Sequence, residues 1–280
     1  MTVKSIWYLV VFFLGLVATE TIRAQDVHQN MVQIPAGEFW MGRTHMWLID
    51  ELGMHLRARL DDQPAHLVYL DSFWIDKYEV TNQDYARFTD TAGHRKPYHW
   101  VDNKIPTGKD TQPVYNVSWD DAIAYCRFAG KRLPTEAEWE RAARGGADQT
   151  LYPWGEQLRP GAAGRGGGGG RGADATATPP AKLAHYGFPN GPTSVGSYPP
   201  NGFGLYDVTG NLWEWTNDWY GHSYYSVSPD KNPKGPETGL YRVIRGGGWS
   251  DNDERLLTLH YRNFTNPDHR TPSVGFRCAM

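Results

Sequence analysis

A short acidic stretch followed by a histidine is the part of the sequence best equipped for chemistry. Asp251, Asp253 and Glu254 lie close together, and His260 follows them. Carboxylates and an imidazole beside an aromatic-lined cleft can transfer protons as general acids and bases, or hold a hard metal ion. The same residues can equally form a solvated loop with salt bridges. We therefore predict Asp251, Glu254 and His260 as candidate catalytic residues, with a solvated loop as the alternative.

Thiol chemistry is limited by the cysteine count. The chain contains only Cys126 and Cys278. This number excludes any function that needs three or more thiolates. The two residues are either paired in a disulfide or are two buried free thiols.

The elements that must position these residues are short. Capping residues predict three helices, each ended by a glycine, over 81–92, 118–129 and 135–144. Alternation of apolar residues predicts a strand over 31–42 with breaks at proline and glycine. Further strands are predicted over 67–75, 195–198, 212–216, 242–245 and 274–278. Between 146 and 200 turn residues dominate, and the glycine-rich run 164–172 is interpreted as a surface insertion, because no strand precedes it and no helix follows it.

Composition excludes several classes of protein. Aromatic residues make up 14% of the 280 residues, beside 31 Gly and 19 Pro, which excludes disordered, collagen-like and coiled-coil chains. The net charge of −3 provides no basic surface for nucleic acid. A domain of short strands and long aromatic-rich loops fits these numbers.

The N-terminus carries the features of an export signal. Lys4 precedes an apolar run over 6–18, and the segment 22–24 is a suitable processing site. The apolar run is shorter than the roughly 20 residues that span a bilayer. We therefore predict a signal peptide over 1–24, a mature domain over 25–280 without a transmembrane span, and a periplasmic or secreted location.

Four ordered motifs give the chain a family resemblance. They are RLPTEAEWE at 132–140, NGFGLYDVTGNLWEW at 201–215, RGGGW at 245–249 and GFRC at 275–278. Together they resemble the formylglycine-generating enzyme (sulfatase-modifying factor) family, from about residue 31 to the C-terminus. The resemblance implies a single α+β domain, a variant of the C-type-lectin fold with little regular secondary structure.

The same resemblance implies a disulfide and a calcium site. Cys126 and Cys278 occupy the positions of a family disulfide, and an exported chain meets an oxidising compartment in which a disulfide persists. Asp207, Gly210, Leu212 and Glu214 match one family calcium site residue by residue, and calcium prefers such carboxylate and carbonyl oxygens. A second family calcium site has no counterpart here, because the loop 183–193 is altered.

Copper is the cofactor that the resemblance leaves without ligands. The generating enzymes oxidise a substrate cysteine with copper(I) on two cysteines that follow a Gly-Gly-Ser motif, and soft thiolates suit copper(I). Here the motif ends at Gly248, and the two cysteines are absent. We therefore predict a protein without the copper site that binds, or assists the maturation of, a peptide-like, protein or glycan partner in the cell envelope.

Two other activities stay open as alternatives. A non-copper oxidoreductase could tailor a peptide-derived metabolite, as a periplasmic relative does in siderophore chromophore maturation. Formylglycine generation requires that copper bind without the cysteine pair, so it ranks behind both.

Overall fold

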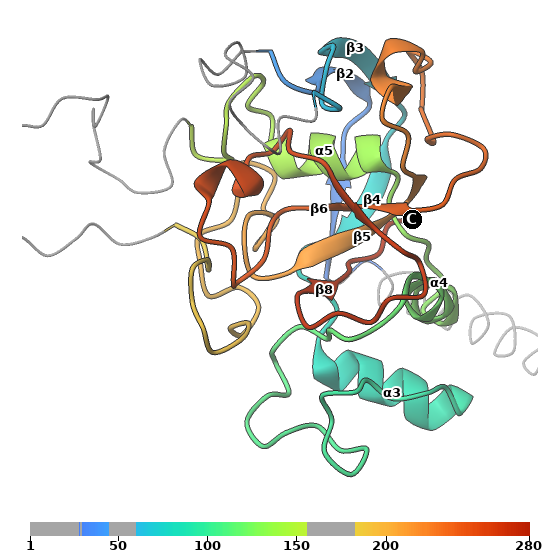
Figure 1. The fold of residues 1–280 in the computed structure, drawn as a ribbon, viewed down its shortest axis with the longest axis vertical. Coiled ribbons are helices and arrows are strands. Elements are labelled where there is room, and N and C mark those ends of the chain that lie inside the picture. The colour runs from blue at the N-terminus through green and yellow to red at the C-terminus, as the bar shows by residue number, and fades with distance from the viewer. Residues whose placement is uncertain (1–27, 29, 45–59, 156–182) are drawn as a thin grey trace, which may run out of the picture.

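The N-terminal strands of the computed structural model pair as two antiparallel ribbons (Figure 1). Strand β1 (Met31–Ile34) pairs with β4 (Phe73–Asp76), and β2 (Gly37–Met41) pairs with β3 (His66–Leu70). The structure describes residues 28, 30–44, 60–155 and 183–280. The predicted signal peptide over 1–24 and the glycine-rich run 164–172 lie outside these residues.

Two strand predictions are wrong. The segment 67–75 is two strands, because the side chain of Asn232 holds Asp71 between them, accepting from its backbone N–H at 2.9 Å and donating to its carboxylate at 2.7 Å. The segment 195–198 is a turn instead of a strand. Its Gly196 has φ +74°, and its N–H donates to Asp207 at 2.6 Å.

The C-terminal half forms a four-stranded sheet in the order β7-β6-β5-β8. The central strand β5 (Trp213–Trp219) is antiparallel to β6 (Arg242–Arg245) and parallel to β8 (Val274–Gly275), and β7 (Asn263–Thr265) is the outer strand next to β6. Two short 3₁₀ helices, η1 (Tyr224–Ser226) and η2 (Glu254–Leu257), interrupt the loops.

The three predicted helices are confirmed with their caps. They are α3 (Asn82–Ala92), α4 (Trp119–Phe128) and α5 (Glu136–Arg144). In α4 and α5 the N-cap hydroxyl and the acid three residues later satisfy each other's backbone N–H groups, as a capping box does. Short local signals of this kind are readable from sequence because they need no tertiary contact.

Two apolar cores lie on either side of the C-terminal sheet. One surrounds Trp139 of α5 and the N-terminal ribbons, and the other lies between α3, α4 and the sheet, where Trp215 and Phe276 are fully buried. Figure 1 shows α5 next to β5 and β6, with α3 at the far end of the molecule. Among the described residues, no helix has the length and apolar character needed to cross a bilayer.

Candidate functional site

Buried ion pairs from α5 position the stretch 245–262. Arg245 donates to Glu136 at 2.6 Å and to Glu140 at 2.7 Å, and Arg262 donates to both oxygens of Glu136 at 2.7 and 2.8 Å. Burial raises the pKa of both glutamates, but the arginine charges outweigh burial and hold the pKa of Glu140 at about 2. Both carboxylates are therefore ionised, and each end of the stretch is held by an arginine.

The glycines that follow Arg245 pass close to the rest of the stretch. Gly247 has φ +77°. A Cβ at this position would lie 2.2 Å from Cδ2 of Leu257, the last residue of η2. No L-residue fits this backbone and this space. The glycine motif therefore has a packing role that is independent of any thiol chemistry.

Two of the predicted catalytic residues lie on the surface side of this stretch. Asp251 accepts from the backbone N–H of Gly248 at 2.8 Å, so its carboxylate closes the turn after the glycines. Glu254 is exposed, and one of its oxygens accepts from the hydroxyl of Tyr186 at 2.7 Å. Its carbonyl accepts from the hydroxyl of Tyr152 at 3.0 Å.

The third predicted residue, His260, is buried in a different environment. Its Nδ1 lies 2.9 Å from Oδ2 of Asp62, which also pairs with Arg43 at 3.2 Å. Burial raises the pKa of Asp62, but the hydrogen bond and charge of His260, together with Arg43, keep that pKa below its ordinary value. Asp62 was missed by the sequence reasoning, since it lies 198 residues from His260 and belongs to no motif.

The structure thus gives Asp251, Glu254 and His260 three different partners and does not assemble them around one point. In the part of the chain that the structure describes, no group of three or more His, Cys, Asp or Glu side chains could hold a metal ion. Their proposed catalytic roles stay predictions.

The turn that carries the predicted calcium ligands has an excess of buried carboxylates. Glu214 is fully buried and accepts from Arg277 at 2.7 Å with each oxygen, and from Trp139 at 2.9 Å. Burial raises the pKa of Asp207 to about 6. Burial, together with Asp207 and Glu214, raises the pKa of Glu79 well above its ordinary value.

These observations test whether calcium suits the turn. Three buried carboxyl groups face one guanidinium, that of Arg277, and Glu79 is satisfied by donors from Asn211 at 2.5 Å and from the Leu212 N–H at 3.1 Å. The three carboxyl groups do not converge as a metal-binding cluster, so calcium would depend on the Asp207 and Glu214 carboxylates together with the Gly210 and Leu212 carbonyls. A hard cation there would offset the remaining negative charge, and the type of these oxygen donors fits calcium. Glu214 would share its carboxylate between the ion and Arg277. Calcium binding by Asp207, Gly210, Leu212 and Glu214 stays a prediction, and Glu79 is a neighbour that the motif did not reveal.

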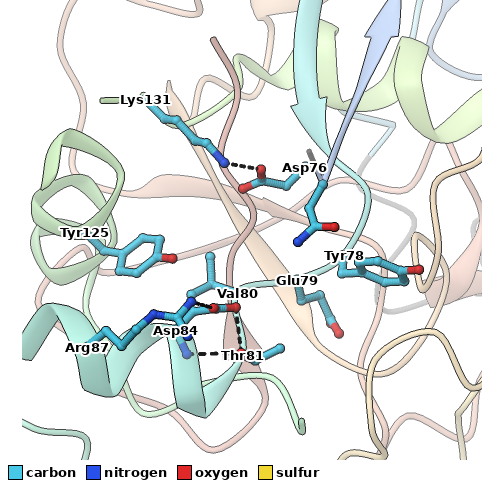
Figure 2. Close-up of a pocket in the computed structure, with 10 residues that line it drawn as sticks. Asp76, Tyr78, Glu79, Val80, Thr81, Asp84, Arg87, Tyr125 and Lys131 are labelled. Atoms are coloured by element: carbon cyan, nitrogen blue, oxygen red, sulfur yellow. Dashed lines mark hydrogen bonds and ion pairs between the residues drawn. The ribbon is translucent and has the colours of Figure 1, made fainter. Parts of the chain in front are cut away.

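A pocket that the sequence did not indicate lies at the start of α3 (Figure 2). Its volume is about 350 Å³. Its lining is polar and contains an ion pair at each of two places, Lys131 with Asp76 and Arg87 with Asp84. Figure 2 shows the Tyr125 side chain from α4 directed into the same space.

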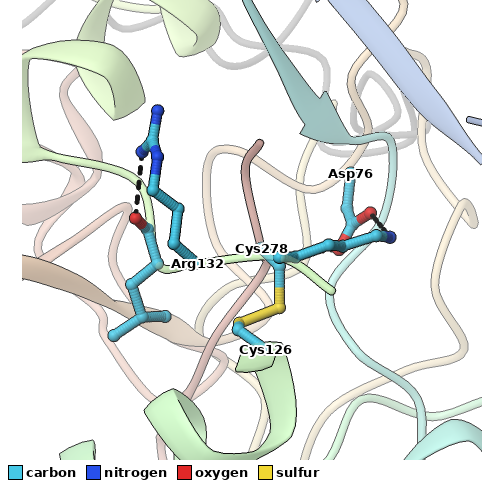
Figure 3. The surroundings of a disulfide bond; sticks show 6 residues. Asp76, Cys126, Arg132 and Cys278 are labelled. Carbon is cyan, nitrogen blue, oxygen red and sulfur yellow. Dashed lines mark hydrogen bonds and ion pairs between the residues drawn. A yellow bond between two sulfur atoms is a disulfide. The ribbon is translucent and has the colours of Figure 1, made fainter. Parts of the chain in front are cut away.

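The predicted disulfide between Cys126 and Cys278 is confirmed (Figure 3). It links α4 to the segment after β8, with a Cα–Cα distance of 5.7 Å, and both residues are fully buried. Since the chain has no other cysteine, no thiolate is available to bind copper(I). A buried disulfide is consistent with an oxidising compartment.

Comparison with known proteins agrees with the motifs. The chain matches the family described as Sulfatase-modifying factor enzyme 1-like domain over residues 18–280. It is 34% identical to formylglycine-generating enzyme from Mus musculus, over 89% of this chain and 74% of that protein, and 35% identical to the enzyme from Streptomyces coelicolor, over 90% and 89%. The solved structure of PvdO from Pseudomonas aeruginosa superposes with a TM-score of 0.67 and 26% identity, covering 89% of this chain and 93% of that one.

These matches confirm the predicted fold class, an α+β C-type-lectin-like domain with little regular secondary structure. The chain therefore belongs to the sulfatase-modifying factor (formylglycine-generating enzyme) domain family, as a member whose only two cysteines form a disulfide.

Proposed function

We propose that this protein is an exported, copper-independent member of its family that binds a peptide-like or glycan partner in the cell envelope and assists its maturation. The disulfide carries this proposal, because it removes both thiols from chemistry while keeping the domain folded. The stretch that follows the glycine motif supports copper independence. In the generating enzymes the copper cysteines follow this motif, whereas here Asp251 follows it and closes the turn at Gly248 by a hydrogen bond.

Aromatic side chains beside this stretch supply a surface for such a partner. Phe188 is 37% exposed, its ring stacks on His185 at a centroid distance of 4.4 Å, and its N–H donates to the carbonyl of Trp249 at 2.9 Å. Flat aromatic rings with nearby polar groups suit extended peptides and sugar rings. Trp213 and Trp215 of β5 do not contribute in the same way, since both are buried.

Copper independence is tested by titrating the purified protein with copper(I) against a competing chelator. We expect no stoichiometric tight binding, and no aldehyde on a cysteine-containing sulfatase peptide followed by mass spectrometry. Tight binding of one copper(I), or conversion of the peptide cysteine, would show that the proposal is wrong.

Partner binding is tested on arrays of extended peptides and of glycans. We expect a ligand class whose binding is lost in Phe188→Ala and kept in Leu240→Ala, a control in which an exposed apolar residue outside this surface is truncated. Equal binding by the two variants would exclude the aromatic surface as the binding site.

An oxidoreductase acting on a peptide-derived metabolite is the second candidate, and the buried His260–Asp62 pair and the likeness to PvdO favour it. An aspartate that holds one imidazole nitrogen orients the histidine for proton transfer. The two candidates are separated by incubating the protein with a siderophore precursor and following conversion of the precursor by its absorbance spectrum and by mass spectrometry. Conversion that falls in His260→Gln and Glu254→Gln supports the enzyme, and absence of conversion with retained array binding supports the binding role.

A further inference from the structure

The pocket at the start of α3 combines two opposite-charge pairs at different depths. Lys131 donates to Asp76 at 2.6 Å, and both side chains are largely buried, with 15% and 12% exposed. At the rim, Arg87 pairs with Asp84, and these side chains are 65% and 34% exposed. The pocket shares no lining residue with the stretch 246–262, so its role does not depend on the proposed function.

The deep pair has N–H donors left over for a ligand. One oxygen of Asp76 accepts from Lys131 and the other from the backbone N–H of Cys278 at 3.0 Å. The ammonium group of Lys131 has three N–H groups and pairs with no second carboxylate among the described residues. The Tyr125 hydroxyl makes no hydrogen bond in the described part of the chain, and Figure 2 shows it directed into the pocket. Two donors therefore line the same pocket, where a ligand carboxylate could accept from both.

The remaining lining favours a ligand that carries both charges. Asp76, Glu79 and Asp84 line the pocket together with Lys131 and Arg87, so groups of both signs face the same space. One oxygen of Asp84 accepts from the hydroxyl of Thr81 at 2.6 Å, and the other accepts from Arg87. The carboxylate is partly exposed, so its remaining lone pairs can accept from a cationic group of a ligand. A positive group at the rim would offset the carboxylates.

We propose that this pocket binds a small zwitterion of the amino-acid class. The ligand carboxylate contacts Lys131 and the Tyr125 hydroxyl, and the ligand ammonium group contacts Asp84. The volume of about 350 Å³ lies at the small end of the range for ligand pockets, which suits a molecule of this size. Burial raises the pKa of Tyr125, so its hydroxyl is a donor at neutral pH.

The disulfide holds two residues that neighbour the pocket lining. Cys126 follows Tyr125 on α4, and Figure 3 shows Asp76 near the disulfide. The backbone N–H of Cys278 donates to Asp76 at 3.0 Å. The pocket is therefore built on the most strongly cross-linked part of the domain, which holds its charged groups in place before a ligand arrives.

The first test is a thermal-shift screen of the full chain with each standard amino acid alone at millimolar concentration, and with glucose as a neutral polyol. A ligand that binds the folded state raises Tm with concentration. We expect at least one amino acid to do so and glucose not to. Calorimetry then compares that amino acid with its N-acetyl and its amide derivatives, each of which lacks one charge. Both should bind at least about tenfold more weakly, since each loses a charge-assisted contact.

Variants locate the site. Tyr125→Phe removes a hydroxyl that satisfies no group of the protein, so Tm without ligand should stay unchanged while the amino acid binds about tenfold more weakly. Tyr98→Phe, at a tyrosine that is 72% exposed outside the pocket, should bind like the wild type. The proposal is overturned if no amino acid binds, if the N-acetyl or amide form binds as tightly as the free amino acid, if glucose binds instead, or if Tyr125→Phe keeps full affinity.

Discussion

Neutralising Glu140 tests whether buried ion pairs hold the stretch 245–262 in place. The carboxylate is fully buried and accepts from Gly42 N–H at 2.9 Å, from Arg144 at 2.7 and 3.1 Å, and from Arg245 at 2.7 Å. Its pKa is held at about 2, against an ordinary value of 4.5. At about 1.4 kcal/mol for each pH unit, this difference corresponds to about 3 kcal/mol. Breaking a buried pair by removing one partner typically costs about 3–5 kcal/mol.

We therefore expect Glu140→Gln to lower the free energy of unfolding at pH 7 by about 3 kcal/mol. Because the folded-state pKa is depressed, the stabilisation by Glu140 is present above pH 4.5 and is lost as the pH falls toward 2. The gap between wild type and variant should therefore shrink to about 1.4 kcal/mol at pH 3.

Urea unfolding followed by tryptophan fluorescence measures both quantities, since the chain contains 12 Trp. Glu138→Gln is the matched control, because it makes the same change on the same helix at a glutamate that pairs with Arg132, whose side chain is 46% exposed. That variant should lose less than about 1 kcal/mol. A gap below about 1 kcal/mol for Glu140→Gln at pH 7, or an equal gap at pH 7 and pH 3, would refute the reasoning.

Three further changes probe the other parts of the domain. Replacing both Cys126 and Cys278 with alanine should lower the free energy of unfolding in urea by about 2–5 kcal/mol, since the bond closes a loop of 152 residues; an unchanged midpoint would contradict this. Asp207→Asn should abolish a calcium-dependent rise of Tm in calorimetry against a chelator, and a rise that persists in the variant would place the ion elsewhere. Asn201→Ala should lower the free energy of unfolding in urea by at least about 2 kcal/mol, because the Asn201 side chain donates to two carbonyls at the end of α5 and accepts from two N–H groups over 203–205. A smaller loss would show that water replaces these hydrogen bonds.

The helices were predictable from local sequence and the disulfide from the family resemblance, whereas two strands were predicted wrongly. A helix start is encoded within four residues, as Thr135 and Glu138 show, so no distant contact is needed to recognise it. The break at Asp71 is imposed by Asn232, which lies 161 residues away. The break also has a local signal, because Asp71 and Ser72 are polar and exposed, and the buried positions change phase from Val68 and Leu70 to Phe73 and Ile75. The prediction of a single strand passed over this signal, and the Asn232 contact reinforces it.

The candidate site was predictable in the same uneven way. Acidic residues near the glycine motif could be picked out by type, but their partners could not, since Asp62 meets His260 across 198 residues. Glu79 likewise reaches Asn211 across 132 residues. A buried acidic residue cannot be distinguished from an exposed one by its residue type alone. Apolar residues on both sides can indicate burial, as buried Ile75 and Val80 do on either side of Glu79.

The motifs that place the chain in its family are themselves the source of these long-range contacts. Glu136 and Glu140 of the first motif bind the arginine that opens the glycine motif, and Glu214 of the second binds Arg277 of the last. All three arginine–glutamate contacts are buried, so losing either partner would leave an unpaired charge in the core. Folding alone therefore requires these residues of the motifs. The family match accordingly establishes the scaffold, and the chemistry must be decided by residues outside these buried contacts, such as Asp251 and Glu254.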